Sequence, residues 1–284
     1  MSNQDRRIAF LQEMGLGPVW SQRTAVLQTL EPEAAAPEEV TEFIEDSVAV
    51  ATPLRVAEQS ASAWGDDDVA ITPAAVPAAP TALVQPATNI GSMNWDQLKA
   101  VVSSCTECGL CKGRTQTVFG VGDQKAKWLF VGEGPGRNED FQGEPFVGPA
   151  GKLLDNMFVA MGLKRGENTY IANIVKCRPT DENKRDRAPV AAESDACLPY
   201  LQRQIELINP TVIVALGKTA ALSLLKLDPA TPVARLRGTV HRYADIPVVV
   251  TYHPAYLLRT LKDKSKAWAD LCLAMQTYAD KANG

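Results

Sequence analysis

The sequence predicts an α/β protein with three α/β/α layers around a central, mostly parallel four-stranded sheet, preceded by a disordered N-terminal arm. Two observations carry this prediction. From about residue 95 onward, short apolar runs alternate with longer segments whose apolar residues recur at helical spacing, and strands separated by helices form parallel sheets covered on both faces. The composition also changes near residue 95, and the roughly 185 residues that follow are enough for one sizeable core.

The N-terminal arm is acidic, whereas the body is mildly basic. Residues 1–96 contain four Arg or Lys and fourteen Asp or Glu, and residues 97–284 contain twenty-five and nineteen. Residues 1–20 predict a short amphipathic helix, either a frayed terminal helix or a docking helix for a protein partner. Residues 21–94 are rich in Ala, Pro and acidic residues and bury too little apolar surface to fold, so they predict a disordered linker.

The elements of the body follow in order. Helices are predicted at 94–102, 149–161, 192–208 and 218–227 and after residue 251, where apolar residues recur every three or four positions. Strands are predicted at 127–131, 169–175, 211–216 and 247–251. Ligands of such sheets bind at the carboxyl ends of the strands. Polar and glycine residues fall at or just beyond these ends, namely Gly132, Glu133, Asn173, Gly217 and His253.

The cysteines indicate a metal site. No signal peptide or membrane-spanning run is visible, because apolar runs such as 212–216 are far shorter than the roughly 20 residues a span needs. We therefore expect a cytoplasmic protein with no membrane partner, in which six cysteines favour metal binding or catalysis over disulfides. Cys105 and Cys108 form a C-x-x-C pair, and Cys177 and Cys197 lie far downstream. Four thiolates suit either zinc or an iron–sulfur cluster, and Cys111 is a spare or a competing ligand.

The glycine-rich segment 132–136 is expected to bind a ligand. It is not a dinucleotide fingerprint, because Pro135 and the acidic pair Glu139–Asp140 stand where that motif opens directly into a helix. Its glycines let the backbone approach a ligand closely, so a site is favoured over a plain tight turn. Residues 217–219 resemble the end of a P-loop, but Val212 replaces the required upstream glycine, which excludes ATP binding.

Only two histidines are present, and one of them suits catalysis. His241 is expected to be a surface or strand residue. His253 follows a buried strand and can donate a hydrogen bond to developing negative charge. With one such histidine, a hydrolytic triad is not indicated.

Taken together, these motifs resemble the family 4 uracil-DNA glycosylases, the iron–sulfur branch of the uracil-DNA glycosylase superfamily. The resemblance covers about residues 98–280 and makes no claim for residues 1–94. Its motifs occur in the family's order: the first cysteine pair with 114–116, 132–136 with 139–140, 143–148, 173–179, Cys197 and 253–259.

The resemblance implies a base site and a DNA-contacting loop. The implied substrate-binding residues are Glu133, Gly134, Pro135, Phe146, Asn173 and His253, with Glu133 and His253 catalytic. Phe146 would stack on the flipped base and Asn173, which carries both a donor and an acceptor, would read its polar edge. Leu257, Leu258 and Arg259 would lie where the family's loop enters the duplex.

The resemblance also implies a cofactor and an activity. A 4Fe–4S cluster would be held by Cys105, Cys108, Cys177 and Cys197. The expected activity is DNA repair: a monomer associated with the nucleoid flips uracil out of DNA and hydrolyses its N-glycosidic bond, leaving an abasic site. The alternative is a non-catalytic nucleic-acid-binding module stapled by zinc.

Two features depart from the family pattern. The acidic N-terminal arm is one. The other is the nineteen residues between Cys177 and Cys197, which include a charged insertion around 181–187 that we expect to be exposed. A related branch that traps its product covalently carries a basic loop ending in histidine here. This chain has Lys184-Arg-Asp-Arg187 and no histidine, so turnover is expected.

Overall fold

The computed structural model describes Glu13 and residues 89–283, so the predicted helix at 1–20, apart from Glu13, and nearly all of the predicted linker at 21–94 lie outside the described residues. In the described part, the body opens with the short 3-10 helix η1 (Ile90–Ser92). Met93 is already buried in the core. The packed body therefore begins a few residues before position 95, where the amino-acid composition changes.

A single mixed sheet forms the centre, with strand order β1-β3-β2-β4-β6-β5. The strands are β1 (Val121–Gly122), β2 (Trp128–Gly132), β3 (Thr169–Asn173), β4 (Val212–Leu216), β5 (Val240–Tyr243) and β6 (Ile246–Thr251). The middle strands β3, β2, β4 and β6 are parallel, as predicted. The predicted number of four strands is wrong, because β1 and β5 add an antiparallel strand at each edge.

The two edge strands carry no apolar run. Strand β1 is two residues long and half-buried, and β5 alternates exposed with half-buried residues. Edge strands of this kind face solvent, so burial does not select an apolar sequence for them. As expected, His241 is a strand residue: it lies on β5.

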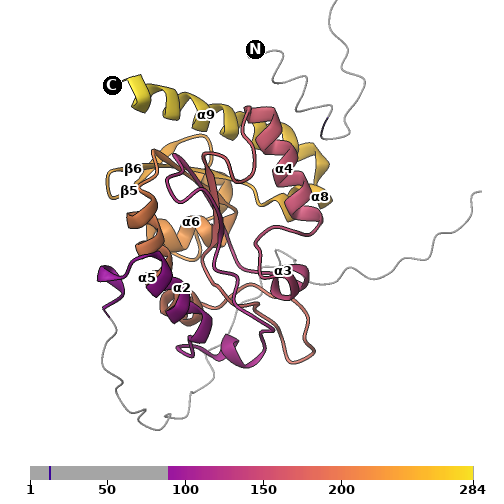
Figure 1. Ribbon diagram of the computed structural model, residues 1–284. Coiled ribbons are helices and arrows are strands. Elements are labelled where there is room, and N and C mark those ends of the chain that lie inside the picture. The colour runs from indigo at the N-terminus through magenta and orange to yellow at the C-terminus, as the bar shows by residue number, and fades with distance from the viewer. Residues whose placement is uncertain (1–12, 14–88, 284) are drawn as a thin grey trace, which may run out of the picture. The chain divides into compact units, whose positions relative to one another are not determined.

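Helices cover both faces of the sheet (Figure 1). One face is covered by α2 (Trp95–Ser104), α5 (Ala191–Ile208), α6 (Lys218–Leu225) and α7 (Val233–Leu236), and the other by α4 (Pro149–Met161), α8 (Pro254–Arg259) and α9 (Lys264–Asn283). Along β2, Leu129 and Val131 enter the first core, whereas Trp128 and Phe130 enter the second. The three-layer prediction is confirmed.

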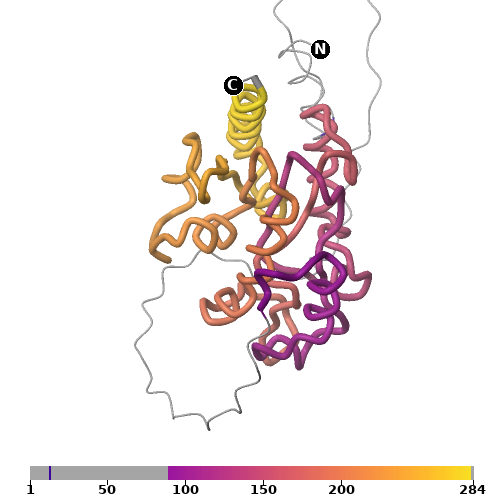
Figure 2. The backbone as a smooth tube through the Cα atoms, turned by 60° about the vertical axis from the view of Figure 1, so that its left-hand side comes forward, coloured from indigo at the N-terminus to yellow at the C-terminus, as the bar shows by residue number. Residues whose placement is uncertain are grey.

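The first and last described helices lie far apart within the body. Figure 2 shows the indigo segment in the lower half of the coloured body and the yellow C-terminal helix at its top. Two further 3-10 helices, η2 (Gly109–Lys112) and η3 (Leu261–Asp263), complete the elements. Among the described helices, none is long and apolar enough to cross a membrane.

A short helix follows the glycine-rich segment. Helix α3 (Arg137–Gln142) starts directly after Gly136 and ends at Gly143, whose φ of 77° is left-handed. The expectation that an acidic run replaces a helix here is wrong. Glu139 and Asp140 lie in the first turn of α3, where backbone amides and the helix dipole favour carboxylates. The acidic pair is therefore part of the helix start.

Candidate active site and cysteine cavity

The predicted strand-end residues lie together where the parallel strands end, at their carboxyl termini. Gly132 ends β2 and pairs in register with Asn173, which ends β3. The Gly217 amide, just after β4, donates to the Thr251 carbonyl at the end of β6, at 2.8 Å. His253 follows two residues later as the N-cap of α8. Four parallel strands thus bring Gly132, Asn173, Gly217 and His253 to the same end of the sheet. Phe146, from the loop between α3 and α4, lies beside Gly132 and His253. We call Gly132, Glu133, Phe146, Asn173 and His253 the strand-end site.

Asn173 presents a buried acceptor that no other described residue satisfies. Its side chain is 2 % exposed, and its Oδ1 has no hydrogen-bond partner. An ideal Cβ placed on Gly132 would lie 2.4 Å from this Oδ1 and 2.6 Å from Cζ of Phe146. Gly132 therefore lets the amide and the ring approach the end of β2. Buried polar groups are almost always paired, so an orphaned acceptor here indicates a ligand.

Phe146 and His253 lie side by side. Their ring centroids are 5.5 Å apart with 28° between the ring planes. Gly217, with a φ of 90°, passes close behind, because a Cβ there would lie 3.0 Å from Cβ of His253. The site therefore offers one flat apolar surface and one imidazole next to the Asn173 amide.

His253 is held as a neutral donor. The Ala255 amide donates to its Nδ1 at 3.1 Å, which leaves the ring proton of the neutral imidazole on Nε2. Desolvation, helped by the nearby positive charge of Arg259, lowers the pKa of His253 to about 4. At neutral pH the ring is therefore uncharged and can donate through Nε2.

Glu133 is a half-buried carboxylate positioned by α6. The Thr219 hydroxyl, in the first turn of α6, donates to its Oε2. Burial raises the pKa of Glu133 above its ordinary value, and the Thr219 hydrogen bond opposes that rise. A raised carboxyl pKa suits a group that accepts a proton near neutral pH.

The loop that carries Glu133 is pinned to the segment after β3. The carbonyls of Gly132 and Glu133 accept the amides of Ile174 and Val175 at 3.0 and 3.1 Å. A Cβ on Gly134 would lie 2.7 Å from Cγ2 of Val175, so only glycine fits this approach. Pro135, next in the loop, is buried.

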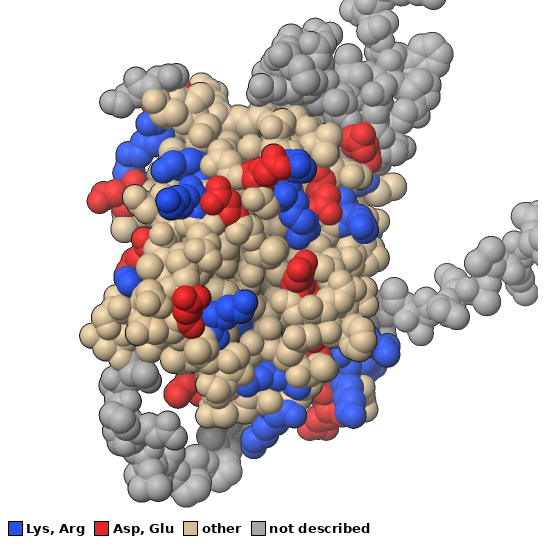
Figure 3. Space-filling view, viewed as in Figure 1, with Lys and Arg blue, Asp and Glu red and all other residues tan. Residues whose placement is uncertain are grey.

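The three residues predicted to contact DNA all lie on α8, but they differ in burial. Leu257 is fully buried in the second core, so it cannot contact DNA in this conformation and that part of the prediction is corrected. Leu258 is 42 % exposed, and Arg259 is also exposed. On the face drawn in Figure 3, Lys and Arg are interspersed with Asp and Glu and do not gather into one basic patch.

The four predicted metal-binding cysteines line one cavity. They come from the end of α2, the start of η2, the loop after β3 and the interior of α5. The cysteine cavity is lined by Cys105, Cys108, Cys111, Cys177 and Cys197, together with Arg114, Lys176 and Tyr200 among others. The structure brings the predicted ligands together and places Cys111 beside them.

Three of these sulfurs accept hydrogen bonds. Arg114 donates from Nη1 to Sγ of Cys177 at 3.2 Å. The Tyr200 hydroxyl donates to Sγ of Cys105 at 3.3 Å, and the Lys176 amide donates to Sγ of Cys197 at 3.2 Å. Such donors stabilise thiolates and orient metal ligands. Burial raises the pKa of the Cys177 thiol and raises that of Cys197 to about 12, and the donors from Arg114 and Lys176 oppose this rise.

Lys176 connects the cavity to the strand-end site. Its Nζ donates to the Asn173 carbonyl at 2.9 Å and to Oε1 of Gln204 at 2.7 Å. The side chain is 1 % exposed, and burial lowers its pKa to about 8. The same residue thus bonds a cysteine sulfur through its amide and the end of β3 through its ammonium.

Sequence reasoning missed several residues of the site. The sequence shows Thr219 only as the end of an incomplete P-loop motif, although its place after a strand end is a usable signal. Arg114 and Lys176 lie in the motifs at 114–116 and 173–179, but a motif does not state their contacts. Tyr200 gives no signal in a single sequence, because its partner Cys105 lies 95 positions away.

Comparison with known proteins identifies the family. Residues 119–272 match the model of the uracil DNA glycosylase superfamily. Type-4 uracil-DNA glycosylases from Archaeoglobus fulgidus and Thermotoga maritima are each 45 % identical, over 169 and 159 residues. These matches cover 57 % and 56 % of this chain, and 82 % and 80 % of the relatives. A type-4 enzyme from Sulfurisphaera tokodaii is 39 % identical over 196 residues, which are 64 % of this chain and 87 % of the relative.

Proposed function

The chain belongs to the uracil-DNA glycosylase superfamily and, within it, to the type-4 enzymes, and from this premise we propose that it removes uracil from DNA by hydrolysing the N-glycosidic bond. The product is an abasic site in an uncut strand. A base inside a duplex is out of reach, so it has to be flipped out, at a cost of a few kcal/mol.

The unpaired Oδ1 of Asn173 is the observation that carries the proposal. Uracil presents an N–H beside a carbonyl on one edge, and a buried acceptor without a partner matches that N–H. Leaving such an acceptor empty is unfavourable by about 1–3 kcal/mol. Occupation by the base removes this penalty, so the site favours a ligand that donates at this position.

The neighbouring side chains fit the rest of the base. Phe146 supplies a ring on which a flipped base can stack. Cleavage of the bond between sugar and base leaves the electron pair on uracil, whose carbonyl oxygen gains negative charge. The neutral His253 donates to that oxygen through Nε2, and one such donor contributes roughly 10²–10³ in rate.

Glu133 acts on the sugar side of the bond. As the base departs, the sugar carbon becomes cation-like and takes a new bond from a water oxygen. The Glu133 carboxylate, held by Thr219, orients that water and accepts its proton. The proton is later released to solvent or to the departing uracil anion, which completes the hydrolysis.

The surface beside the site supports entry of DNA. Leu258 and Arg259 are exposed at the end of α8, the helix whose N-cap is His253. An exposed apolar side chain can fill the space that a flipped base leaves, and an arginine can bind a phosphate. These two residues are our proposed DNA contacts.

The cysteine cavity fits a 4Fe–4S cluster on Cys105, Cys108, Cys177 and Cys197. Its donor set is all sulfur, and three of those sulfurs accept protein hydrogen bonds, as cluster ligands do. Among the described residues, no three His, Cys, Asp or Glu side chains are arranged to hold a metal ion, so the choice of an iron–sulfur cluster over zinc rests on the resemblance to family 4. When bound, the cluster would tie the segment before β2 to the loop after β3.

Further proposals concern turnover and assembly. We propose that the protein acts as a monomer on nucleoid DNA. In the charged insertion, Arg187 is held by Glu193 at 2.7 Å, and the loop has no histidine to form an adduct. The enzyme therefore releases its product.

Oligonucleotide cleavage tests the function. Purified protein is incubated with matched oligonucleotides that contain uracil or thymine at one position, and the products are heated in alkali. We expect strand scission only at uracil. No scission, or equal scission at thymine, would overturn the proposal in favour of the non-catalytic module.

A separate measurement identifies the metal. Iron, sulfide and zinc are measured in the same protein sample. Iron and sulfide are expected for a cluster, and zinc alone would show that the site is a zinc site.

A further inference from the structure

Phe146 has a backbone conformation that needs support. Its φ is 56°, in the left-handed region, and it is an aromatic residue, for which this conformation is unfavourable. Residues in this region keep it only when their surroundings determine it, and they cluster at functional sites. Three neighbours of Phe146 meet this requirement.

Helix α4 approaches the Phe146 backbone without a side chain between them. An ideal Cβ on Gly151 would lie 1.8 Å from the Phe146 carbonyl oxygen and 2.2 Å from its carbonyl carbon. Any other residue at 151 would push the 145–148 segment away. The first turn of α4 therefore supports Phe146 from behind.

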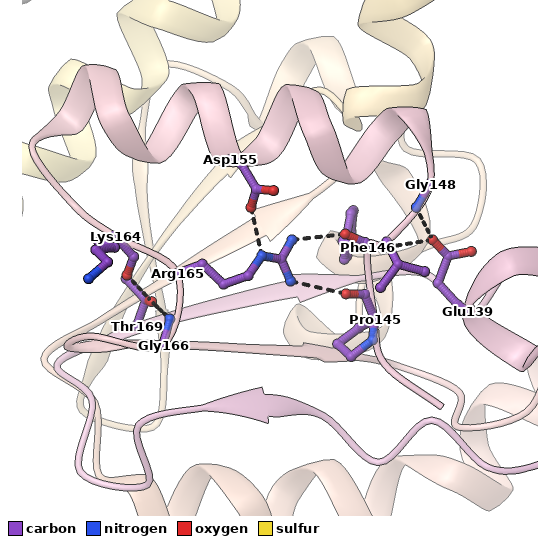
Figure 4. Close-up of polar contacts among 10 residues, drawn as sticks. Glu139, Pro145, Phe146, Gly148, Asp155, Lys164, Arg165, Gly166 and Thr169 are labelled. Atoms are coloured by element: carbon purple, nitrogen blue, oxygen red, sulfur yellow. Dashed lines mark hydrogen bonds and ion pairs between the residues drawn. The ribbon is translucent and has the colours of Figure 1, made fainter. Parts of the chain in front are cut away.

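Arg165 binds the carbonyl side of this segment. Its Nη2 donates to the Phe146 carbonyl at 2.8 Å, and its Nη1 donates to the Pro145 carbonyl at 3.2 Å. Its Nε donates to Oδ1 of Asp155, on α4, at 2.6 Å. Figure 4 shows the guanidinium between Asp155 and the two carbonyls. Asp155 belongs to α4, so this helix orients the guanidinium that binds the Phe146 carbonyl.

Glu139 binds the amide side of the same segment. Its Oε1 accepts the amides of Val147 and Gly148, both at 2.9 Å (Figure 4). Its helix, α3, is anchored in turn, because the buried Asp140 accepts the Thr115 amide at 2.9 Å. The Arg165 guanidinium thus donates to the carbonyls of Pro145 and Phe146, and the Glu139 carboxylate accepts the amides of the next two residues.

We propose that Arg165 and Glu139 are positioning residues that set the backbone of Phe146 and so hold its ring where the flipped base stacks. The inference rests on the proposed function, because it assigns Phe146 to the base. Both charged groups reach Phe146 through the backbone of the 145–148 segment. Charge-assisted hydrogen bonds of this kind are about twice as strong as neutral ones, which suits them to hold a strained residue.

A double-mutant cycle tests the proposal. Single-turnover uracil excision is measured for wild type, Arg165→Met, Glu139→Ala and Phe146→Ala, and for each of the first two variants combined with Phe146→Ala. We expect Arg165→Met and Glu139→Ala to slow excision by about tenfold or more in wild type, since misplacement by about 1 Å has effects of this size. In the Phe146→Ala background the same changes should cost less than about twofold, because no ring remains to be positioned.

Controls separate positioning from loss of the fold. Lys164→Met changes the neighbouring side chain, which is 73 % exposed and pairs only with Glu167, so it should keep the wild-type rate. Glu139→Gln and Arg165→Lys keep one acceptor and one cation, and should recover part of the rate. Affinity for abasic DNA, which has no base to stack, should stay unchanged in all variants.

The outcomes distinguish this inference from the proposed function. Wild type that releases no uracil overturns the function. Wild type that excises uracil while Arg165→Met and Glu139→Ala match it overturns the positioning role alone. Full penalties that persist in the Phe146→Ala background, or an unaltered rate in Phe146→Ala itself, also overturn it.

Discussion

The cysteine cavity and the strand-end site lie at the two ends of one short segment, residues 173–177, yet their polar atoms are treated in opposite ways. In the cavity, three sulfurs receive donors from Arg114, Tyr200 and the Lys176 amide. In the strand-end site, the buried Oδ1 of Asn173 has no partner among the described residues. Three sulfurs of the cavity already have protein donors, whereas the Asn173 acceptor is open to a ligand.

This difference separates stability from activity. A satisfied network contributes to folding, so its loss destabilises the protein. An unsatisfied acceptor and a left-handed Phe146 are unfavourable in the free protein, and in the proposed function they act only when a base is bound. Substitutions in the two regions should therefore affect different measurements.

The largest effect is expected for Cys177→Ala. Metal binding couples to folding, so loss of a ligand should lower the free energy of unfolding by about 4 kcal/mol or more and remove the brown colour of a cluster. Urea unfolding and iron analysis measure this. Cys272→Ala, on α9 and outside the cavity, is the matched control and should keep its iron. A colourless wild type, or a Cys177→Ala protein as stable as wild type, would show that the ligand set is wrong.

The next effect is expected for Asn173→Ala and His253→Ala. His253→Ala should lower single-turnover excision by roughly 10²–10³, the size seen when one transition-state donor is lost. Asn173→Ala removes the acceptor for the uracil N–H and should lower the rate by a similar factor of about 10² or more. Asn173→Ala should leave the unfolding free energy unchanged or slightly raised, because it removes an unpaired polar atom. Full activity in either variant would remove that residue from the mechanism, and a strong loss of stability would erase the contrast with Cys177.

Gly132→Ala should have a smaller effect, confined to the strand-end site. The new Cβ would lie 2.4 Å from Oδ1 of Asn173 and 2.6 Å from the Phe146 ring, so both side chains have to move. We expect a loss of about tenfold or more in rate. Gly162→Ala, at a left-handed helix end with nothing near its Cβ, is a control for backbone strain alone. Equal rates for the two variants would mean that the site is less crowded than the structure shows.

The smallest effect is a displacement of the pH profile. Glu133 has to be charged to act, and burial raises its pKa, so the rate should fall as the pH drops through a value above the ordinary pKa of a glutamate. Removing the Thr219 hydroxyl raises that pKa further, so Thr219→Val should move the acid limb to higher pH, with Thr219→Ser close to wild type. His253, with a pKa of about 4, should not contribute to this limb. If the acid limb of the pH–rate profile does not move in Thr219→Val, a group other than Glu133 controls the rate there.

Local signals account for what could be predicted. The four inner strands are apolar because both of their faces are buried, so their sequence identifies them and the residues at their ends. The edge strands β1 and β5 face solvent and leave no such pattern. Leu257 and Leu258 show the same limit, because neighbouring leucines on one helix differ from fully buried to 42 % exposed, and a motif does not say which is which.

The sequence by itself determined the class of the fold, the strand ends that meet, and the cysteines that share a cavity, because burial periodicity and residue chemistry are local properties. Only the tertiary structure decided how these residues are held. Arg165 reaches the Phe146 carbonyl across 19 positions, Thr219 reaches Glu133 across 86, and Tyr200 reaches Cys105 across 95. Such contacts depend on which elements pack together, and no spacing along a single chain encodes that.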